Sequence, residues 1–248
     1  MCLKGIEKKC KQDTIDYEVL IVDNGSSDRT LDIIAQYSKG GMPILLTRLR
    51  KNRGTTCTRN IALKKCTGDI ICILDSDTAF LDGSLSELVS ELLKYETVGI
   101  LAPKLVESTG NIQASVKKFP SVFGKILKIP EIIFKIRLKD FDAYEQFPFT
   151  ESTEVDCAIS ACWFFRRGLL NRVGYLDERI FYAPEDVDYC LRVKKAGKKI
   201  LYYPKVTVLH QTQQITHKNF LSKIALSHFF GLAYYFYKHK YLRKPSIG

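Results

Sequence analysis

Two aspartates, Asp75 and Asp77, follow a short apolar run over residues 70–74. An apolar run without polar alternation is typical of a strand buried on both faces, and open α/β sheets bind ligands at the carboxyl ends of such strands. On a continuing strand, side chains two positions apart point to the same side. Carboxylate oxygens placed in this way suit Mg²⁺ or Mn²⁺, which also coordinate phosphate oxygens. A polar turn that ends the strand is the alternative interpretation.

Other polar side chains also stand where an expected strand ends or an expected helix begins. These candidates are Asp23, Asn52, Gly54, Arg59, Asn60 and His210. Each has an ordinary structural interpretation: a turn cap for Asp23, a solvated helix surface for Arg59, and a satisfied polar group for His210. Their common position near the carboxyl ends of strands favours a shared binding site.

Acidic residues crowd around the start of a helix expected over residues 185–195. The cluster consists of Asp177, Glu178, Glu185, Asp186 and Asp188. A carboxylate within hydrogen-bond reach of a hydroxyl group can act as a general base. Acids near a helix N-terminus are also favoured by the helix dipole. Because a cap requires one acid and not three, the cluster also indicates chemistry.

The first hundred residues alternate between strand and helix patterns. We expect strands over residues 17–22, 43–49, 70–74 and 98–102, and helices over 29–37, 55–65 and 84–94. Ser84 and Glu87 form a capping-box pattern at the start of the last of these helices. This alternation predicts an α/β fold with a mainly parallel sheet covered on both faces.

The rest of the chain departs from this alternation. We expect one long buried strand over residues 155–166 and two short strands, 199–203 and 206–210, around a proline. Helices are expected over the ranges 168–173, 185–195 and 220–237. The segment 117–139 mixes apolar and basic residues, which fits either a surface-lying amphipathic segment or an ordinary helix packed on the core.

Charge is distributed unevenly along the 248 residues, whose net charge is +11. Twelve basic residues and no acid follow Asp188, so residues 1–188 are close to neutral. A basic C-terminal region favours an anionic partner, and its aromatic helix over 220–237 fits a membrane interface or packing on the catalytic domain. Eight cysteines without a C-x-x-C pair fit reduced thiols and a cytosolic location.

Five stretches, in this order, carry a family resemblance. They read YEVLIVDNGSSDRT, NRGTTCTRNIAL, GDIICILDSDTAF, GYLDERIFYAPEDVDYCLRVKKAGKKILYYP and VLH. They cover most of residues 1–210 and resemble glycosyltransferase family 2, whose members act on nucleotide-diphosphate sugars and have the GT-A fold. The fourth stretch looks most like the subgroup with rhamnosyl- and related transferases of cell-surface polysaccharides. The resemblance implies a GT-A catalytic domain over residues 1–215, with a mixed, mainly parallel sheet and helices on both faces, and a basic aromatic tail over 216–248.

The resemblance also implies roles on the donor side of the site. Mg²⁺ or Mn²⁺ would be held by Asp77, with Asp75 touching metal or ribose and His210 completing the metal site. The chain departs from the family after His210, where it reads HQTQQIT and members often have Gly and Ser. The remaining donor-binding positions by resemblance are Asp23, on the base or ribose, Arg59, near the diphosphate, and the loop residues Asn52 and Gly54.

On the acceptor side, Asp186 matches the general base of inverting relatives. Glu185 is expected to hold acceptor hydroxyls, and Asp188 is the second candidate for the base. The implied function is transfer of a sugar, with inversion, to a glycan or polyprenyl-linked acceptor in surface polysaccharide or glycoconjugate synthesis. The expected place of action is the cytoplasm, peripheral to an anionic membrane surface and without nucleic acid as a partner.

Two other functions compete with this interpretation. A nucleotidyltransferase also combines an α/β sheet with an acid-bound metal, but such enzymes usually open with a Gly-rich phosphate loop, which is not visible here. A non-catalytic membrane- or nucleic-acid-binding protein would use the basic tail but leaves the acidic cluster without a purpose.

The start of the chain carries one further expectation. Relatives begin with a strand, a loop and a helix before the strand that matches residues 17–22, whereas residues 2–12 here already have the pattern of that helix. We therefore expect an N-terminally incomplete version of the fold, with an open groove beside residues 17–22 and a half-built nucleotide pocket.

Overall fold

The computed structural model describes residues 1–128, 141–144, 146–211, 223–242 and 245. Of the expected amphipathic segment over 117–139, residues 117–128 are described and include α5, whereas 129–139 lie outside the described residues. The helices are α1 (Cys2–Asp13), α2 (Thr30–Lys39), α3 (Thr55–Leu63), α4 (Leu85–Lys94), α5 (Val122–Leu127), α7 (Gly168–Val173), α8 (Glu185–Lys195) and α9 (Lys223–His239). The strands are β1 (Val19–Asp23), β2 (Ile44–Arg48), β3 (Ile70–Leu74), β4 (Thr78–Asp82), β5 (Val98–Val106), β6 (Val116–Lys117), β7 (Thr153–Val155), β8 (Cys157–Ala158), β9 (Cys162–Arg166) and β10 (Lys199–His210).

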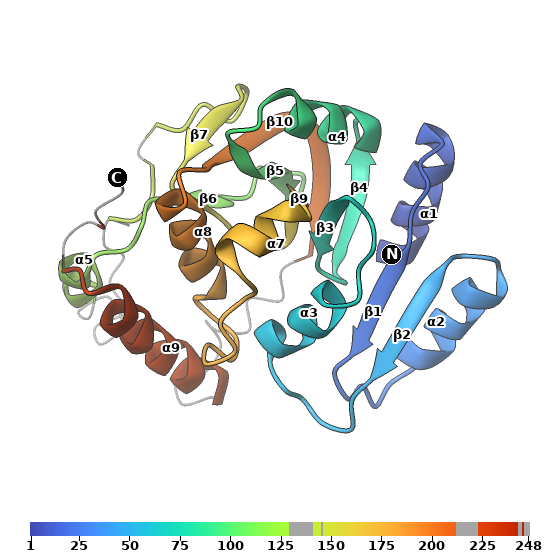
Figure 1. Cartoon of the computed structure of the whole chain (residues 1–248), viewed down its shortest axis with the longest axis horizontal. Coiled ribbons are helices and arrows are strands. Elements are labelled where there is room, and N and C mark those ends of the chain that lie inside the picture. The colour runs from blue at the N-terminus through green and yellow to red at the C-terminus, as the bar shows by residue number, and fades with distance from the viewer. Residues whose placement is uncertain (129–140, 145, 212–222, 243–244, 246–248) are drawn as a thin grey trace.

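A mixed six-stranded sheet forms the centre of the molecule (Figure 1). Its order is β3-β9-β5-β10-β4, with β7 paired to β10. Strands β3, β5 and β10 run in one direction, because β9 is antiparallel to both β3 and β5, and β10 is parallel to β5. Strands β4 and β7 run the other way. The expected α/β class with a mixed sheet is confirmed.

Alternate side chains of the central strands supply two separate apolar cores. In β5, Leu101 packs into one core, and Ile100 and Ala102 pack into the other. In β9, Phe164 packs into the same core as Leu101, and Trp163 packs into the other. Successive side chains of a strand point to opposite faces, which explains this alternation. Helices α1 and α4 cover the first core, and α3, α7, α8 and α9 cover the second, so the sheet is covered on both faces (Figure 1).

Three expectations about strands need correction. Residues 155–166 do not form one strand, because the chain leaves the extended conformation at Asp156 and again in a turn at residues 160–161. The pieces β7, β8 and β9 pair with different partners. The apolar strand β3 is not buried on both faces: it lies at the edge of its sheet, and Cys72 is exposed. Residues 199–210 form one strand, with a register shift beside the proline.

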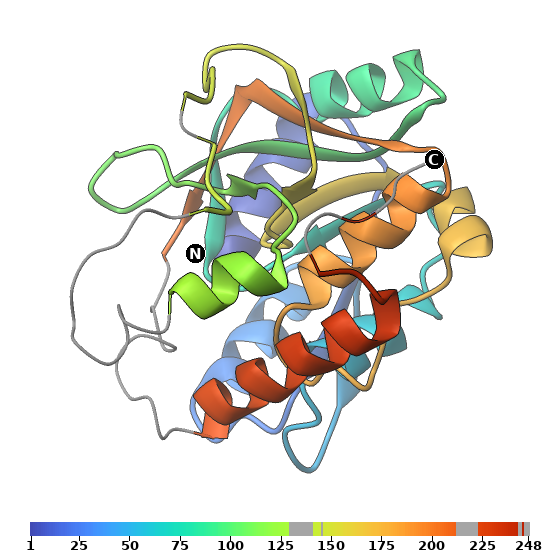
Figure 2. The ribbon, with the colours of Figure 1, turned by 90° about the vertical axis from the view of Figure 1, so that its left-hand side faces the viewer.

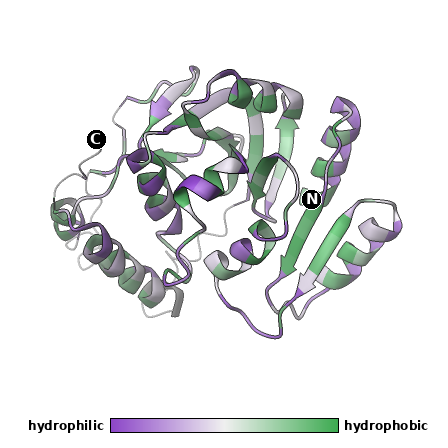
Figure 3. Cartoon of the chain, viewed as in Figure 1, coloured by the Kyte–Doolittle hydropathy of each residue, from purple (hydrophilic) through white to green (hydrophobic). Residues whose placement is uncertain are grey.

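Strands β1 and β2 form a separate two-stranded parallel sheet, and both are strongly apolar (Figure 3). Among the described strands, β1 pairs with β2 alone, and β3 pairs with β9 alone. Residues 2–13 form the expected helix α1, which packs against β4. The second edge of β1 therefore has no partner among the described strands, and the expected groove beside residues 17–22 stays a prediction.

Candidate active site

Asp75, Asp77 and His210 bring three potential metal-ligand atoms within 4.8 Å of one another; we call these residues the metal triad. The two aspartates lie in the turn between β3 and β4, not on a continuing strand as expected. Thr78 closes this turn by donating its backbone N–H (3.1 Å) and its hydroxyl (2.6 Å) to the carbonyl of Asp75. His210 pairs with Thr78 across the β4–β10 ladder, which places the imidazole beside the turn.

Gln113 orients the imidazole of His210. The Gln113 side-chain oxygen lies 3.0 Å from Nδ1. An amide oxygen only accepts, so Nδ1 donates in this contact, and Nε2 faces the carboxylate of Asp77 at 3.5 Å. Metal-binding histidines commonly donate their second ring nitrogen in this manner. The buried His210 therefore has the orientation of a ligand.

The electrostatics of the metal triad favour a cation. Burial raises the pKa of Asp77, the charge of Asp75 raises it further, and His210 opposes both. A raised carboxyl pKa means that the ionised form lacks compensating charge. Two carboxylates and one imidazole are suitable ligands for a divalent ion such as Mn²⁺ or Mg²⁺, so the residues present fit the metal that the sequence predicts.

Arg59, on α3, joins the metal triad to the acidic cluster. Its guanidinium lies 2.6 Å from Asp75 and 3.1 Å from Glu185. It also donates to the hydroxyl of Ser160 at 2.7 Å. The Arg59 side chain is only 12% exposed, so this charge is little screened by solvent. The two halves of the predicted site are thereby brought together.

Glu185 and Asp186 open helix α8 beside Arg59. Glu185 accepts a hydrogen bond from Ser160 at 3.0 Å, and the Asp186 carboxylate accepts one from the backbone N–H of Val187 at 2.8 Å. Burial and the charge of Asp186 raise the pKa of Glu185 to about 7, against the effect of Arg59. Burial also raises the pKa of Asp186. Carboxyl groups tuned in this way can take up a proton near neutral pH.

The structure places Asp188 elsewhere. Its side chain is fully buried, 2.9 Å from Arg192, 2.6 Å from Lys238 and 2.8 Å from His239. Burial alone raises a carboxyl pKa, yet the hydrogen bond from His239 and the charge of Arg192 hold the pKa of Asp188 below its ordinary value. A carboxylate engaged by two cationic side chains and a histidine is a poor proton acceptor.

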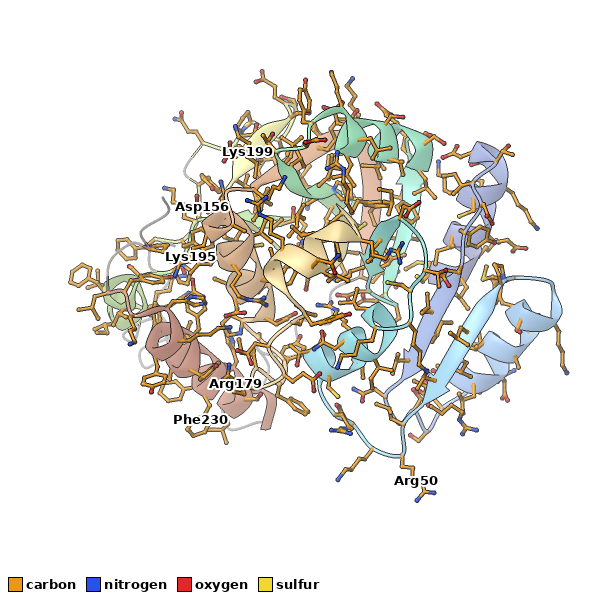
Figure 4. All side chains as sticks on the ribbon, viewed as in Figure 1. Arg50, Asp156, Arg179, Lys195, Lys199 and Phe230 are labelled. Atoms are coloured by element: carbon orange, nitrogen blue, oxygen red, sulfur yellow. The ribbon has the colours of Figure 1, made fainter. Side chains whose placement is uncertain are left out.

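The remaining candidates gather at the ends of β1 and β2. The carboxylate of Asp23 accepts from the backbone N–H of Ser26 at 3.1 Å. The Asn52 side-chain oxygen accepts from Asn24 and from the backbone N–H of Gly54, both at 2.8 Å. These bonds shape two adjoining loops. Arg50, on the second loop, points away from the body of the chain (Figure 4).

Gly54 connects this loop to the acidic cluster. Its φ of +85° favours glycine, and a Cβ there would lie 2.3 Å from the carbonyl oxygen of Phe181. The next residue, Thr55, donates its backbone N–H to the same oxygen at 2.8 Å. The start of α3 and the chain before α8 are therefore in direct backbone contact.

Gln113 and Ser160 are site residues that the sequence did not reveal. Gln113 reaches His210, 97 positions away, because its backbone N–H bonds to the carbonyl of Leu105 in β5, the neighbour of β10. Ser160 stands in a stretch that reads as an uninterrupted strand. A bond between residues so distant in sequence leaves no local signal.

Comparisons with known proteins agree with this geometry. The family model described as Glycosyl transferase family 2 matches residues 3–174. A curated relative is the N-acetylglucosaminyl-diphospho-decaprenol L-rhamnosyltransferase of Mycobacterium tuberculosis, 29% identical over 220 residues that cover 85% of this chain and 71% of the relative.

Two solved structures are also similar. GalNAc-T7 with UDP, GalNAc and Mn²⁺ has a TM-score of 0.57 and 16% identity over 79% of this chain. TarS 1–349 of S. aureus in complex with UDP has a TM-score of 0.55 and 20% identity over 84% of this chain. The chain spans 38% and 55% of these two proteins. At such identities the likeness shows the fold.

We predict that Asp77→Ala abolishes stabilisation by Mn²⁺, because it removes one of three ligands. A ligand at a hundred times its Kd stabilises a folded protein by about 2.7 kcal/mol, so the Tm of the unaltered chain should rise with Mn²⁺ and that of the variant should not. Asp69→Ala is the matched control, since this aspartate is 96% exposed just before the same strand. An equal Mn²⁺-dependent rise in Tm for Asp77→Ala would contradict the metal assignment.

Proposed function

Because the chain belongs to glycosyltransferase family 2, we propose that it transfers a sugar from a nucleotide-diphosphate donor to a lipid-linked or glycan acceptor, with inversion and with a divalent metal. The observation that carries this proposal is the bridge through Arg59, whose guanidinium contacts Asp75 of the metal triad and Glu185 of the acidic cluster. A site for a leaving diphosphate and a site for a base thus lie on two sides of one buried cation.

On the donor side, the metal triad would hold Mg²⁺ or Mn²⁺, which when bound neutralises charge that develops on a leaving diphosphate. Arg59 adds a fixed positive charge next to Asp75. We assign Asp23 to the nucleoside, and Asn52 and Gly54 to the donor pocket. These assignments are supported by the position of the three residues at or just after the ends of β1 and β2, because parallel strands commonly present ligand-binding loops there.

On the acceptor side, we assign Asp186 as the general base and Glu185 as the group that holds acceptor hydroxyls. The acceptor oxygen forms a bond to the anomeric carbon as the bond from that carbon to the diphosphate oxygen breaks. The acceptor proton passes to Asp186, and the electron pair of the broken bond leaves with the diphosphate. Attack opposite the leaving group inverts the anomeric centre, as in inverting hydrolysis. Asp188, held by Arg192, Lys238 and His239, has no catalytic part in this proposal.

The class of acceptor follows from the relative named above, whose printed name describes a diphospho-decaprenol substrate. We propose a polyprenyl-linked or glycan acceptor, reached at the cytoplasmic face of a membrane by a peripheral catalytic domain. Among the residues that the structure describes, no helix combines the length and apolar character needed to cross a bilayer.

Helix α9, within the basic tail over 216–248, supplies a surface suited to such contact. Phe229 and Phe230 are each 66% exposed, and Tyr237 is 77% exposed. Figure 2 shows α5 beside α9, consistent with the hydrogen bond from the backbone N–H of Val122 to the carbonyl of Leu242. Exposed aromatic side chains in a chain segment without acids suit an anionic membrane interface.

Replacing Asp186 with Asn tests the base. We expect transfer to fall on the order of 10²-fold or more, with stabilisation by Mn²⁺ and the donor retained, measured by product formation and by Tm. Asp69→Asn serves as the control for loss of one negative charge. An active Asp186→Asn enzyme, together with an inactive Asp188→Asn enzyme of normal Tm, would assign the base to Asp188 instead.

The pH dependence of transfer should report the buried carboxyl groups. A carboxylate base works only when deprotonated, so kcat/KM rises as pH rises through the carboxyl pKa. Burial raises the pKa of Asp186 and raises that of Glu185 to about 7. With saturating Mn²⁺, we therefore expect the acid limb of kcat/KM above the ordinary carboxyl pKa of about 4. A limb centred in that ordinary range would contradict the assignment.

Membrane binding should depend on the aromatic residues of α9. We expect the unaltered chain to sediment with anionic vesicles and to be released by salt, because surface attraction is screened by ions. Phe229→Ser combined with Phe230→Ser should weaken this binding several-fold. Tyr95→Ser is the control, since Tyr95 is 45% exposed and follows α4, far along the chain. Equal sedimentation of the double variant and the control would count against the membrane surface.

A further inference from the structure

Residues 176–184, which we call the acidic loop, connect α7 to α8 and lead directly into Glu185 and Asp186. Helix α3 holds the loop from one side. Asn60 donates to the carbonyl of Leu176 at 2.9 Å and accepts from its backbone N–H at 3.0 Å. The hydroxyl of Thr56 donates to the carbonyl of Ile180 at 2.7 Å. These contacts fix the loop against the donor half of the site.

Helix α9 holds the same loop from the other side. The ammonium group of Lys238 lies 2.8 Å from Asp177, at the start of the loop, and 2.6 Å from Asp188, in the first turn of α8. Tyr234 donates its hydroxyl to Asp177 at 3.0 Å, and His239 lies 2.8 Å from Asp188. Lys238 thus bridges Asp177 and Asp188. Most of the acidic loop and both acceptor-side acids, Glu185 and Asp186, lie between these two residues in the sequence.

The end of the loop touches α9 through a glycine. A Cβ on Gly231 would lie 2.2 Å from the carbonyl oxygen of Ala183, so the helix backbone lies directly against the chain that precedes α8. Arg179, on the loop, stacks over the ring of Tyr234 at 4.9 Å. Figure 4 shows Arg179 beside α9 and Phe230 on the outer side of the helix.

We propose that α9 sets the position of Glu185 and Asp186 for transfer, with Lys238 as the positioning residue that ties Asp177 to Asp188. This inference rests on the proposed function. Neither the loop nor α9 falls in the part of the chain that the family model matches, which ends at residue 174.

The burial and the ionised state of the two aspartates support this role. The side chains of Asp177 and Asp188 are 9% and 1% exposed, so their attraction to Lys238 is little weakened by solvent. The pKa of each is lowered, Asp177 by hydrogen bonds from Arg179 and Lys238 that outweigh burial, so both stay ionised. Removing one partner of a buried ionic contact is far more disruptive than losing a surface pair.

The consequence is a helix with two functional faces. Gly231 and Tyr235 stand four positions apart on the buried face. Phe230 and Tyr237, seven positions apart, lie on the exposed face, as the helical period predicts. Contact of the outer face with a lipid surface and placement of the catalytic carboxylates therefore involve one rigid element.

Replacing Lys238 with Met in the full chain tests the proposal, because Met keeps the apolar stem and removes the charge. Amide hydrogen exchange of residues 177–188 should become about tenfold faster or more, while that of α3 and β3 stays unchanged. The kcat for transfer should fall about ten- to a hundredfold, since displacement of a catalytic group by an ångström can cost that much. The KM for the donor should change little. Lys238→Arg should restore both properties, because a guanidinium can also bridge two carboxylates.

Lys240→Met is the matched control, since Lys240 is exposed two residues further on. A second variant, Gly231→Ala, should lower kcat although alanine favours helix more than glycine does. Unchanged exchange in the acidic loop of Lys238→Met, or an equal loss of kcat in Lys240→Met, would overturn the proposal. The exchange measurement requires no substrate, so absence of transfer in the unaltered chain would refute the proposed function while the exchange data still decide the role of α9.

Discussion

The buried guanidinium of Arg59 is the interaction on which the site depends. Without a cation at this point, the buried carboxylate of Glu185 and the partly exposed carboxylate of Asp75 would both lose their compensating charge, which for a buried carboxylate is costly. Because Arg59 comes from α3, and the two carboxylates come from the β3–β4 turn and from α8, one side chain fixes the relative position of three elements. Arg59 also lies between the two parts of the proposed site, because it contacts Asp75 on one side and Glu185 on the other.

The sheet supplies the rest of this arrangement. The pairing of β10 with both β4 and β5 brings His210 to the turn that carries Asp75 and Asp77, and brings Gln113 to His210. The metal triad is thus a product of strand order, and the orientation of its imidazole depends on Gln113. Helix α9 packs on the acidic loop and on the first turn of α8. Lys238 contacts Asp177 and Asp188, and Gly231 lies against Ala183.

Local patterns predicted much of this structure. Helices α7 and α8 have the predicted bounds, and Ser84 caps α4 by accepting from the backbone N–H of Glu87, as the sequence indicates. The stretch 155–166 was predicted incorrectly because a continuous apolar run conceals the break at Asp156 and the turn at Ser160. An apolar run in the sequence indicates which residues are buried. It does not indicate where a strand ends, and most of these residues are buried on both sides of the break. Roles that depend on partners far along the chain, such as Gln113 with His210 and Asp188 with Lys238, could not be read from the sequence, since the contacts exist only after folding.

The central claim is that a carboxylate takes the proton of the acceptor while a diphosphate leaves from the opposite side of the sugar. The most direct measurement is the anomeric configuration of the product, determined by NMR, with the donor first identified by its stabilisation of the chain in the presence of Mn²⁺. We expect the configuration to be inverted relative to the donor. Retention of the donor configuration would contradict the roles assigned to Asp186 and Glu185.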